Sequence, residues 1–170
     1  ERAAVPADEA ASAAYVHRGT RAIQRMVEHA PATGSLALWM HHRDDDGIDG
    51  DVLACTDGAT IRYGPAFEAL PLPRQTGVVA HEVLHVALRH VPRYRALQRQ
   101  LEDVDLELFN ICADAIVTSA LGHLDWLEVE PRAVRLEDLL VDVLGVREDP
   151  NRALLEWDVE RLYRAVDDRR

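Results

Sequence analysis

The sequence predicts an α+β fold. Stretches with strand character are confined to residues 36–63, while apolar residues recur at helical spacing before and after them. Helices and strands therefore fall into separate blocks rather than alternating, which is typical of α+β proteins. The 170 residues, 48% of them hydrophobic, are enough for one domain with a sizeable core. We expect residues 1–170 to form this single domain.

The first two predicted elements are a helix and a strand. A suitable N-cap at Asp8 and a stop signal at Pro31 bound a helix over residues 8–29. The apolar run Leu36–His41 is predicted to be a strand. The chain starts with neither a methionine nor a signal-peptide core, so we expect it to have been trimmed, processed or cut from a longer protein.

An acidic loop and a hairpin are predicted next. Residues 44–51 are rich in Asp and Gly, but they lack the spacing and the terminal Glu of a calcium-binding EF-hand loop. A solvated acidic turn is the better interpretation. Two short strands, 51–56 and 60–63, flank the dipeptide Asp57-Gly58, which is a strong hairpin signal.

The rest of the chain is predicted to be helical. A cap at Asp103 or Asp105, a stop at Gly145 and a cap at Asp158 delimit the later helices. The predicted helices cover residues 74–90, 106–121, 136–144 and 159–166.

The helix over residues 74–90 carries the motif H-E-x-x-H. On a helix, residues four apart share one face, so His81 and His85 can present both imidazoles to one cation. Glu82 lies close to that face and can act on a metal-bound water without being a ligand itself. The flanking residues are apolar almost all round, which indicates a largely buried helix. Buried imidazoles and a buried carboxylate need partners, and a metal ion would satisfy them.

A catalytic zinc usually takes three protein ligands, so a third must come from elsewhere in the chain. His90 is an unsuitable candidate, because it would lie on nearly the opposite side of a continuous helix from His85. We expect His90 to be a capping or hydrogen-bonding residue. Asp114 is a better candidate, because it lies at the apolar stripe of the helix over residues 106–121, four residues after Asn110. The alternative is a structural Asp114, tied to an arginine or a backbone amide.

The chain resembles the zincin-like metallopeptidase domain that bacteria carry N-terminal to a von Willebrand factor A-like domain. The resemblance covers the whole chain and is carried by three segments. These are Cys55-Thr56-Asp57-Gly58, the run from Ala80 to His90 together with Arg93, and Asn110-Ile111-Cys112-Ala113-Asp114.

This resemblance implies a zincin-like fold, in which a small mixed sheet packs on the H-E-x-x-H helix and on a second ligand-bearing helix, with a helical C-terminal tail. It implies Zn²⁺ as cofactor, a peptide or protein as substrate, and metallopeptidase activity. It also implies a setting with MoxR-type AAA+ ATPases and a von Willebrand factor A-like domain as partners.

The chain departs from the related gluzincin pattern at one position. There the second helix carries Glu-x-x-x-Asp, with the Glu on zinc and the Asp supporting a ligand His. Here the run is Asn110-x-x-x-Asp114, and Asn is a poor zinc ligand. Either Asp114 moves onto the metal, or the site has two His and a weak third partner. We favour His81, His85 and Asp114 on zinc, with Asn110 in support and Glu82 acting on the water.

Charge and cysteine content narrow the class of protein further. The net charge of −11 argues against non-specific binding to nucleic acid or to an anionic membrane. No apolar run approaches the length of a transmembrane helix. Cys55 and Cys112 are expected to be free thiols in a reducing compartment, so we expect a cytoplasmic protein.

Three functional interpretations stay open at this point. The first is an active zinc peptidase whose extended substrate adds to the edge of the small sheet. The second is a catalytically silent zinc-binding module that serves as an adaptor for a MoxR-type AAA+ system. The third is a structural domain without metal. The presence of Glu82 beside both motif histidines favours the first.

Overall fold

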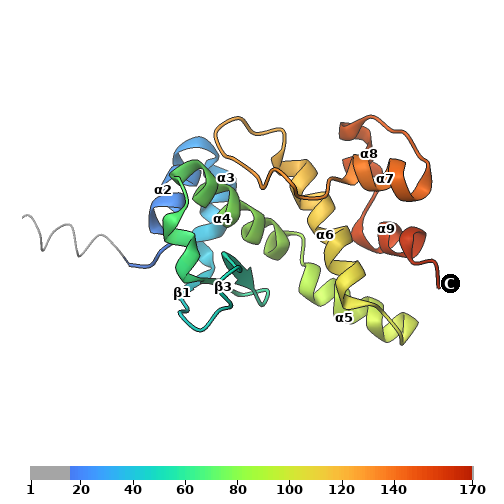
Figure 1. Ribbon diagram of the computed structural model, residues 1–170, viewed down its shortest axis with the longest axis horizontal. Coiled ribbons are helices and arrows are strands. Elements are labelled where there is room, and N and C mark those ends of the chain that lie inside the picture. The colour runs from blue at the N-terminus through green and yellow to red at the C-terminus, as the bar shows by residue number, and fades with distance from the viewer. Residues whose placement is uncertain (1–15, 170) are drawn as a thin grey trace, which may run out of the picture.

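The computed structural model describes residues 16–169 and confirms the α+β class, with a small three-stranded sheet at one margin of a mainly helical molecule (Figure 1). The elements that it contains, in chain order, are α2 (Thr20–His29), α3 (Pro31–Trp39), β1 (His41–Asp44), β2 (Ala54–Thr56), β3 (Thr60–Tyr63), a 3₁₀ helix (Pro65–Ala69), α4 (Leu72–Ala87), α5 (His90–Leu101), α6 (Leu106–Leu121), α7 (Leu136–Leu144), α8 (Pro150–Glu156) and α9 (Val159–Val166). In the described part of the chain, no helix is long and apolar enough to cross a membrane.

The sheet has the order β1-β3-β2, so β2 is an edge strand. Strand β1 runs parallel to β3, and β2 runs antiparallel to it. The β2–β3 hairpin forms at the predicted dipeptide, where Gly58 has a φ of 96° and the Asp57 side chain accepts hydrogen bonds from the backbone of Ala59 and Thr60. The prediction for residues 60–63 is confirmed, and the first hairpin strand is shorter than predicted.

The strand predicted over residues 36–41 is wrong, because most of this segment belongs to helix α3. Pro31 lies in the first turn of α3, where its fixed φ suits a helix. Gly34 lets α3 pack closely on α2, since a Cβ at this position would come 2.6 Å from the backbone of Val27. Only Ala37 of the apolar run is fully buried, while Leu38 and Trp39 are exposed. A short apolar run fits a strand or a helix equally well from its periodicity, and packing against α2 decides between them here.

The first helix is also shorter than predicted. Helix α2 begins at Thr20, and residues 16–19 before it are not helical. Gly19 lies against the ring of Tyr63, where a Cβ would overlap the ring atoms. The predicted start at Asp8 lies outside the described residues.

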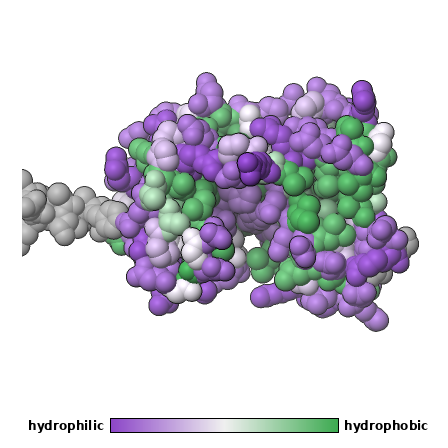
Figure 2. Space-filling model, in the orientation of Figure 1, coloured by the Kyte–Doolittle hydropathy of each residue, from purple (hydrophilic) through white to green (hydrophobic). Residues whose placement is uncertain are grey.

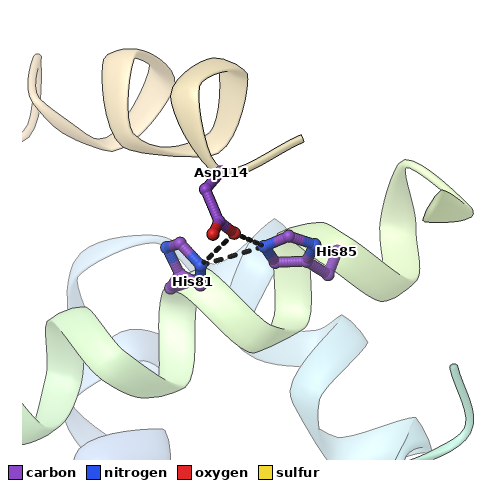
Figure 3. A group of neighbouring side chains, drawn as sticks. All are labelled: His81, His85 and Asp114. Carbon is purple, nitrogen blue, oxygen red and sulfur yellow. Dashed lines mark hydrogen bonds and ion pairs between the residues drawn. The ribbon is translucent and has the colours of Figure 1, made fainter. Parts of the chain in front are cut away.

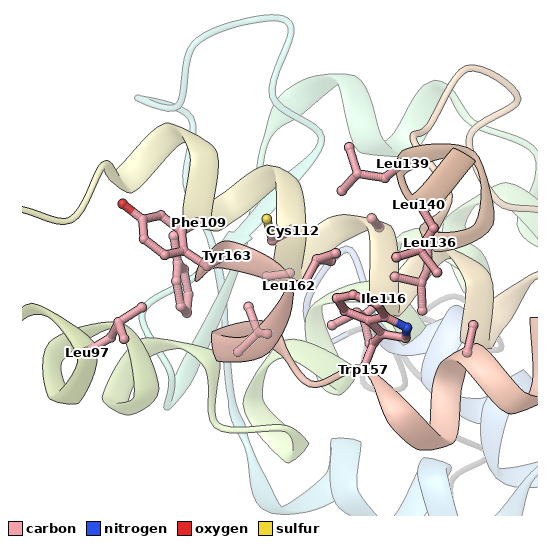
Figure 4. Packing of buried hydrophobic residues seen from close by; sticks show 14 of the residues in the cluster. Leu97, Phe109, Cys112, Ile116, Leu136, Leu139, Leu140, Trp157, Leu162 and Tyr163 are labelled. Atoms are coloured by element: carbon pink, nitrogen blue, oxygen red, sulfur yellow. The ribbon is translucent and has the colours of Figure 1, made fainter. Parts of the chain in front are cut away.

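Two hydrophobic clusters build the interior, and helix α6 belongs to both. The sheet-side core combines α2, α3, the sheet and α4 with Val117 and Leu121 of α6. The tail-side core combines α5, α7, α8 and α9 with Phe109, Cys112 and Ile116 of α6 (Figure 4). Because α6 contributes to both clusters, it fixes the two halves of the chain relative to each other.

The helical tail follows the predicted boundaries closely. Helices α6, α7 and α9 have the predicted limits. Asp105 and Asp158 cap α6 and α9 through their side chains, and Gly145 ends α7 in a left-handed conformation with a φ of 66°. Helix α8 was not predicted, although Asp149 caps it and Pro150 occupies its first turn.

Replacing Gly34 by Ala tests the close contact between α2 and α3. The added methyl group meets the Val27 backbone, which cannot move aside. Overpacking of about 2–3 kcal/mol, reduced by the roughly 1 kcal/mol helix preference of Ala, leaves an expected net loss of about 1–2 kcal/mol in the free energy of unfolding. Urea denaturation of Gly34→Ala measures this loss. Gly50→Ala is the control, because open space surrounds Gly50, and equal stability of the two variants would contradict the packing.

Candidate metal centre

Helix α4 places the motif histidines opposite helix α6. Its buried face includes Val79, Ala80 and Val83, which belong to the sheet-side core. This packing directs His81 and His85 away from the core and toward α6, where Asp114 faces them (Figure 3). The two histidines share one helix face because they are separated by one helical turn.

The three side chains bring their ligand atoms close together. Nε2 of His81 lies 3.2 Å and Nε2 of His85 lies 3.0 Å from Oδ1 of Asp114, and the two Nε2 atoms are 2.9 Å apart. In a tetrahedral zinc site with bonds of about 2.0–2.1 Å, ligand atoms are roughly 3.3 Å from one another. Two imidazole nitrogens and one carboxylate oxygen at these separations could therefore hold a metal ion after a small outward movement.

Mutual hydrogen bonding sets the charge of this group. Burial by itself raises the pKa of Asp114, but hydrogen bonds to His81 and His85 outweigh it and hold the pKa well below its usual range. Burial lowers the pKa of His81, and the hydrogen bond to Asp114 with the nearby carboxylate charges reverses the effect and raises it. Asp114 is thus ionised at neutral pH, as a metal ligand must be.

Glu82 lies beside the three ligand candidates but is not bonded to them. Burial raises the pKa of its carboxyl group, against the lowering effect of His81 and His85. Within residues 16–169, no hydrogen bond or ion pair engages the Glu82 carboxylate. It is therefore free to accept a proton. Glu82 and His81 both line two neighbouring hollows in the surface, so the space beside them opens into each hollow.

The predicted helix over residues 74–90 is wrong at its C-terminal end. Helix α4 ends at Ala87, and Arg89 adopts a left-handed conformation with a φ of 60° before α5 begins at His90. This reversal turns His90 back toward the site, where its Nδ1 lies 2.9 Å from Nδ1 of His85. His90 is indeed a hydrogen-bonding residue, as expected, but the reason given for it, a continuous helix, does not hold.

The second residue expected on α6 lies differently from Asp114. Asn110 is exposed and lines the hollow that also contains His81, His85 and Asp114. Among the described residues it makes no hydrogen bond to any of these three. Its supporting role stays a prediction.

An open cleft gives access to the ligand candidates. One hollow of about 560 Å³ lies between strand β2 on one side and helices α5 and α6 on the other, with His81, His85 and Asp114 in its lining. Figure 2 shows the surface hollowed between these two halves of the molecule. The Asp114 side chain is 48% exposed and that of His85 16%, so α6 offers its ligand from the open side. The lining from α5, which includes Tyr94 and Arg95, was missed at the sequence level because that helix was not predicted.

The structure thus defines an α+β protein whose H-E-x-x-H helix and second helix together form a candidate metal-binding site. Compared with known protein families, residues 14–170 match the family described as "Putative metallopeptidase domain", and the chain belongs to this family. No match was found among curated proteins or among solved structures. Cys55 and Cys112 are both free, as expected.

Replacing Asp114 by Ala tests the third ligand. We expect Asp114→Ala to weaken metal binding by more than the roughly 10–100-fold that loss of a supporting partner costs, because a charged donor is removed. Competition with a chromophoric chelator measures the affinity. Asn110→Ala is the matched control on the same helix, and the double variant His81→Ala, His85→Ala should bind no metal at this site. Equal effects of Asp114→Ala and Asn110→Ala would refute the assignment.

Proposed function

We propose that this chain is a zinc-dependent peptidase in which His81, His85 and Asp114 hold Zn²⁺ and Glu82 is the general base. The observation that carries the proposal is the convergence of three ligand atoms beside an unpartnered carboxylate, on the wall of an open cleft. Two imidazoles and one carboxylate form a donor set typical of catalytic zinc, which keeps a further position for water.

The chemistry follows from the placement of Glu82. When bound, zinc supplies a Lewis acid that lowers the pKa of a water and polarises a carbonyl group. Glu82 accepts a proton from the attacking water as its oxygen bonds to the amide carbon. Glu82 then passes this proton to the amide nitrogen as the C–N bond breaks. The second proton of the water leaves the new carboxyl group for the amine, so the products are a carboxylate and an ammonium group.

Strand β2 is a suitable binding position for an extended substrate. It is one of the two edge strands, so its outer backbone groups have no strand neighbour in the described sheet. Ala54, Cys55 and Thr56 of this strand line the same cleft as the ligand candidates. A peptide that adds to this edge would therefore run past Glu82 and the metal centre.

Replacing Glu82 by Gln separates metal binding from catalysis. The substitution keeps the shape of the side chain and removes the base, so we expect zinc content to stay unchanged and turnover to fall by about 10²–10⁴-fold. Elemental analysis and cleavage of a labelled unfolded protein measure the two effects. Glu28→Gln is the control, since this exposed glutamate on α2 lines neither hollow of the cleft.

Two results would contradict the proposal in different ways. Wild-type activity in Glu82→Gln would exclude Glu82 as the base. Zinc binding without turnover in the wild type, also with a MoxR-type ATPase and a von Willebrand factor A-like partner present, would favour the silent adaptor module instead.

A further inference from the structure

A second hollow, which we call the side recess, adjoins Glu82 on the other side of the metal centre. Its volume is about 270 Å³, and His81, Glu82 and Ala54 belong to the linings of both hollows. The side recess is therefore a branch of the cleft directly at the reacting centre. Its walls are mainly apolar and come from β2 and the residue before it, from α4 and from the segment before α7, namely Leu53, Ala54, Val78, Val129 and Ala133.

Charged side chains also line the side recess, and only some of them have a hydrogen-bond or ion-pair partner. Arg74 is already occupied, because it donates a hydrogen bond of 2.7 Å to the carbonyl of Val129 and forms an ion pair with Glu130. The carboxylates of Asp51 and Glu128 have no ion pair or hydrogen bond with any residue in the described part of the chain. The side recess thus offers apolar walls and two unpaired negative charges.

The side recess is held in shape by close contacts between α4 and residues 128–130. Gly77 lies against the carbonyl oxygen of Glu128, where a Cβ would overlap it. The backbone N–H of Glu128 donates to the carbonyl of Pro73 at 3.1 Å, and Arg74 binds the next carbonyl. A binding site fixed in this way loses little entropy when a ligand enters it.

We propose that the side recess binds a lysine or arginine side chain of the substrate next to the scissile bond. This inference rests on the proposed peptidase function. Lysine and arginine combine a long apolar stem with a cationic head, which matches the apolar walls and the two carboxylates. An acidic substrate side chain would meet like charges at the same place.

Peptide hydroxamates that differ in one side chain test this specificity without relying on turnover. The probes carry Lys, norleucine or Glu beside the metal-chelating group, and norleucine supplies the apolar stem without the charge. With the zinc-loaded chain, we expect the Lys probe to bind about 5–10-fold more tightly than the norleucine probe, and the Glu probe to bind most weakly. Calorimetry measures the three affinities.

Variants assign the preference to the two carboxylates. In Asp51→Asn, Glu128→Gln we expect the Lys and norleucine probes to bind equally, with the norleucine affinity unchanged. Glu28→Gln, which removes a distant exposed charge, should keep the preference. Equal binding of Lys and norleucine to the wild type, or an undiminished preference in the double variant, would overturn the inference. If zinc binds and no hydroxamate does, the proposed peptidase function fails along with it.

A separate observation concerns the far side of His85. Its Nε2 faces His81 and Asp114, and its Nδ1 lies 2.9 Å from Nδ1 of His90. An imidazole that binds a metal through Nε2 carries its proton on Nδ1, and it can donate this proton to any neighbouring atom that has a free lone pair. His90 is only 4% exposed, and its Nδ1 is directed at Nδ1 of His85, so the neutral His90 ring offers the lone pair that this proton needs.

We further propose that His90 is a positioning residue that accepts the Nδ1 proton of His85 and fixes the orientation of this metal ligand. The left-handed Arg89 places His90 at this distance. Most metal-binding histidines use a carboxylate, a carbonyl or water for this purpose, and here a second histidine takes their place.

Two substitutions separate the hydrogen bond from the shape of the ring. His90→Phe keeps an aromatic ring without an acceptor, and His90→Asn keeps an acceptor near the position of Nδ1. We expect the zinc affinity to fall by about 10–100-fold in His90→Phe and much less in His90→Asn. Tyr94→Phe, in the same cleft, is the control and should not change it. Thermal unfolding of the metal-free variants checks that all of them fold.

Nitrogen NMR of the zinc-loaded wild type provides an independent readout. We expect His85 to carry its proton on Nδ1, with this proton slow to exchange and hydrogen-bonded to His90. Equal losses of zinc affinity in the Phe and Asn variants, or a His85 without a proton on Nδ1, would overturn the proposal.

Discussion

The contact between α4 and α6 at Asp114 is the constraint on which the site depends. One carboxylate faces two imidazoles there. In this partly desolvated environment, leaving either the carboxylate or the imidazoles without a partner would cost free energy. Helix α6 can meet this requirement only at one height along α4. Because α6 also joins the sheet-side and tail-side cores, the same contact fixes how the two halves of the chain lie, and hence the width of the cleft. The charge pairing and the apolar packing thus require the same arrangement.

The parts of the site that follow from local spacing could be predicted from the sequence. His81 and His85 were expected on one face because they lie one helical turn apart, and Asp114 was expected from its place on an apolar stripe. Capping residues and glycines also fixed the limits of α6, α7 and α9, because Asp105, Asp158 and Gly145 act through bonds within a few residues. Such signals are strong because no distant part of the chain competes with them.

The parts that depend on tertiary contacts could not be predicted. The apolar run in α3 looks like a strand until the close approach of Gly34 to Val27 is known. The break at Arg89 carries no sequence signal, since a left-handed arginine is uncommon and glycine or asparagine would be expected there. In the predicted continuous helix, His90 lies far from His85. The prediction therefore also lacked helix α5, which forms one wall of the cleft. The identity of the metal and the reaction stay predictions, because they depend on ions and substrates rather than on chain packing.

Helix α4 links the features of the cleft through its register. Arg74, Val78, His81 and His85 follow one another at intervals of three or four residues, so they form a continuous stripe on one side of the helix. The first two contribute to the side recess and the last two to the candidate metal centre. A shift of one residue within α4 would rotate one pair by about 100° relative to the other and separate the side recess from the candidate metal centre. The spacing that positions the candidate ligands therefore also positions the side recess, and the net charge of −11 would attract cationic chains toward both.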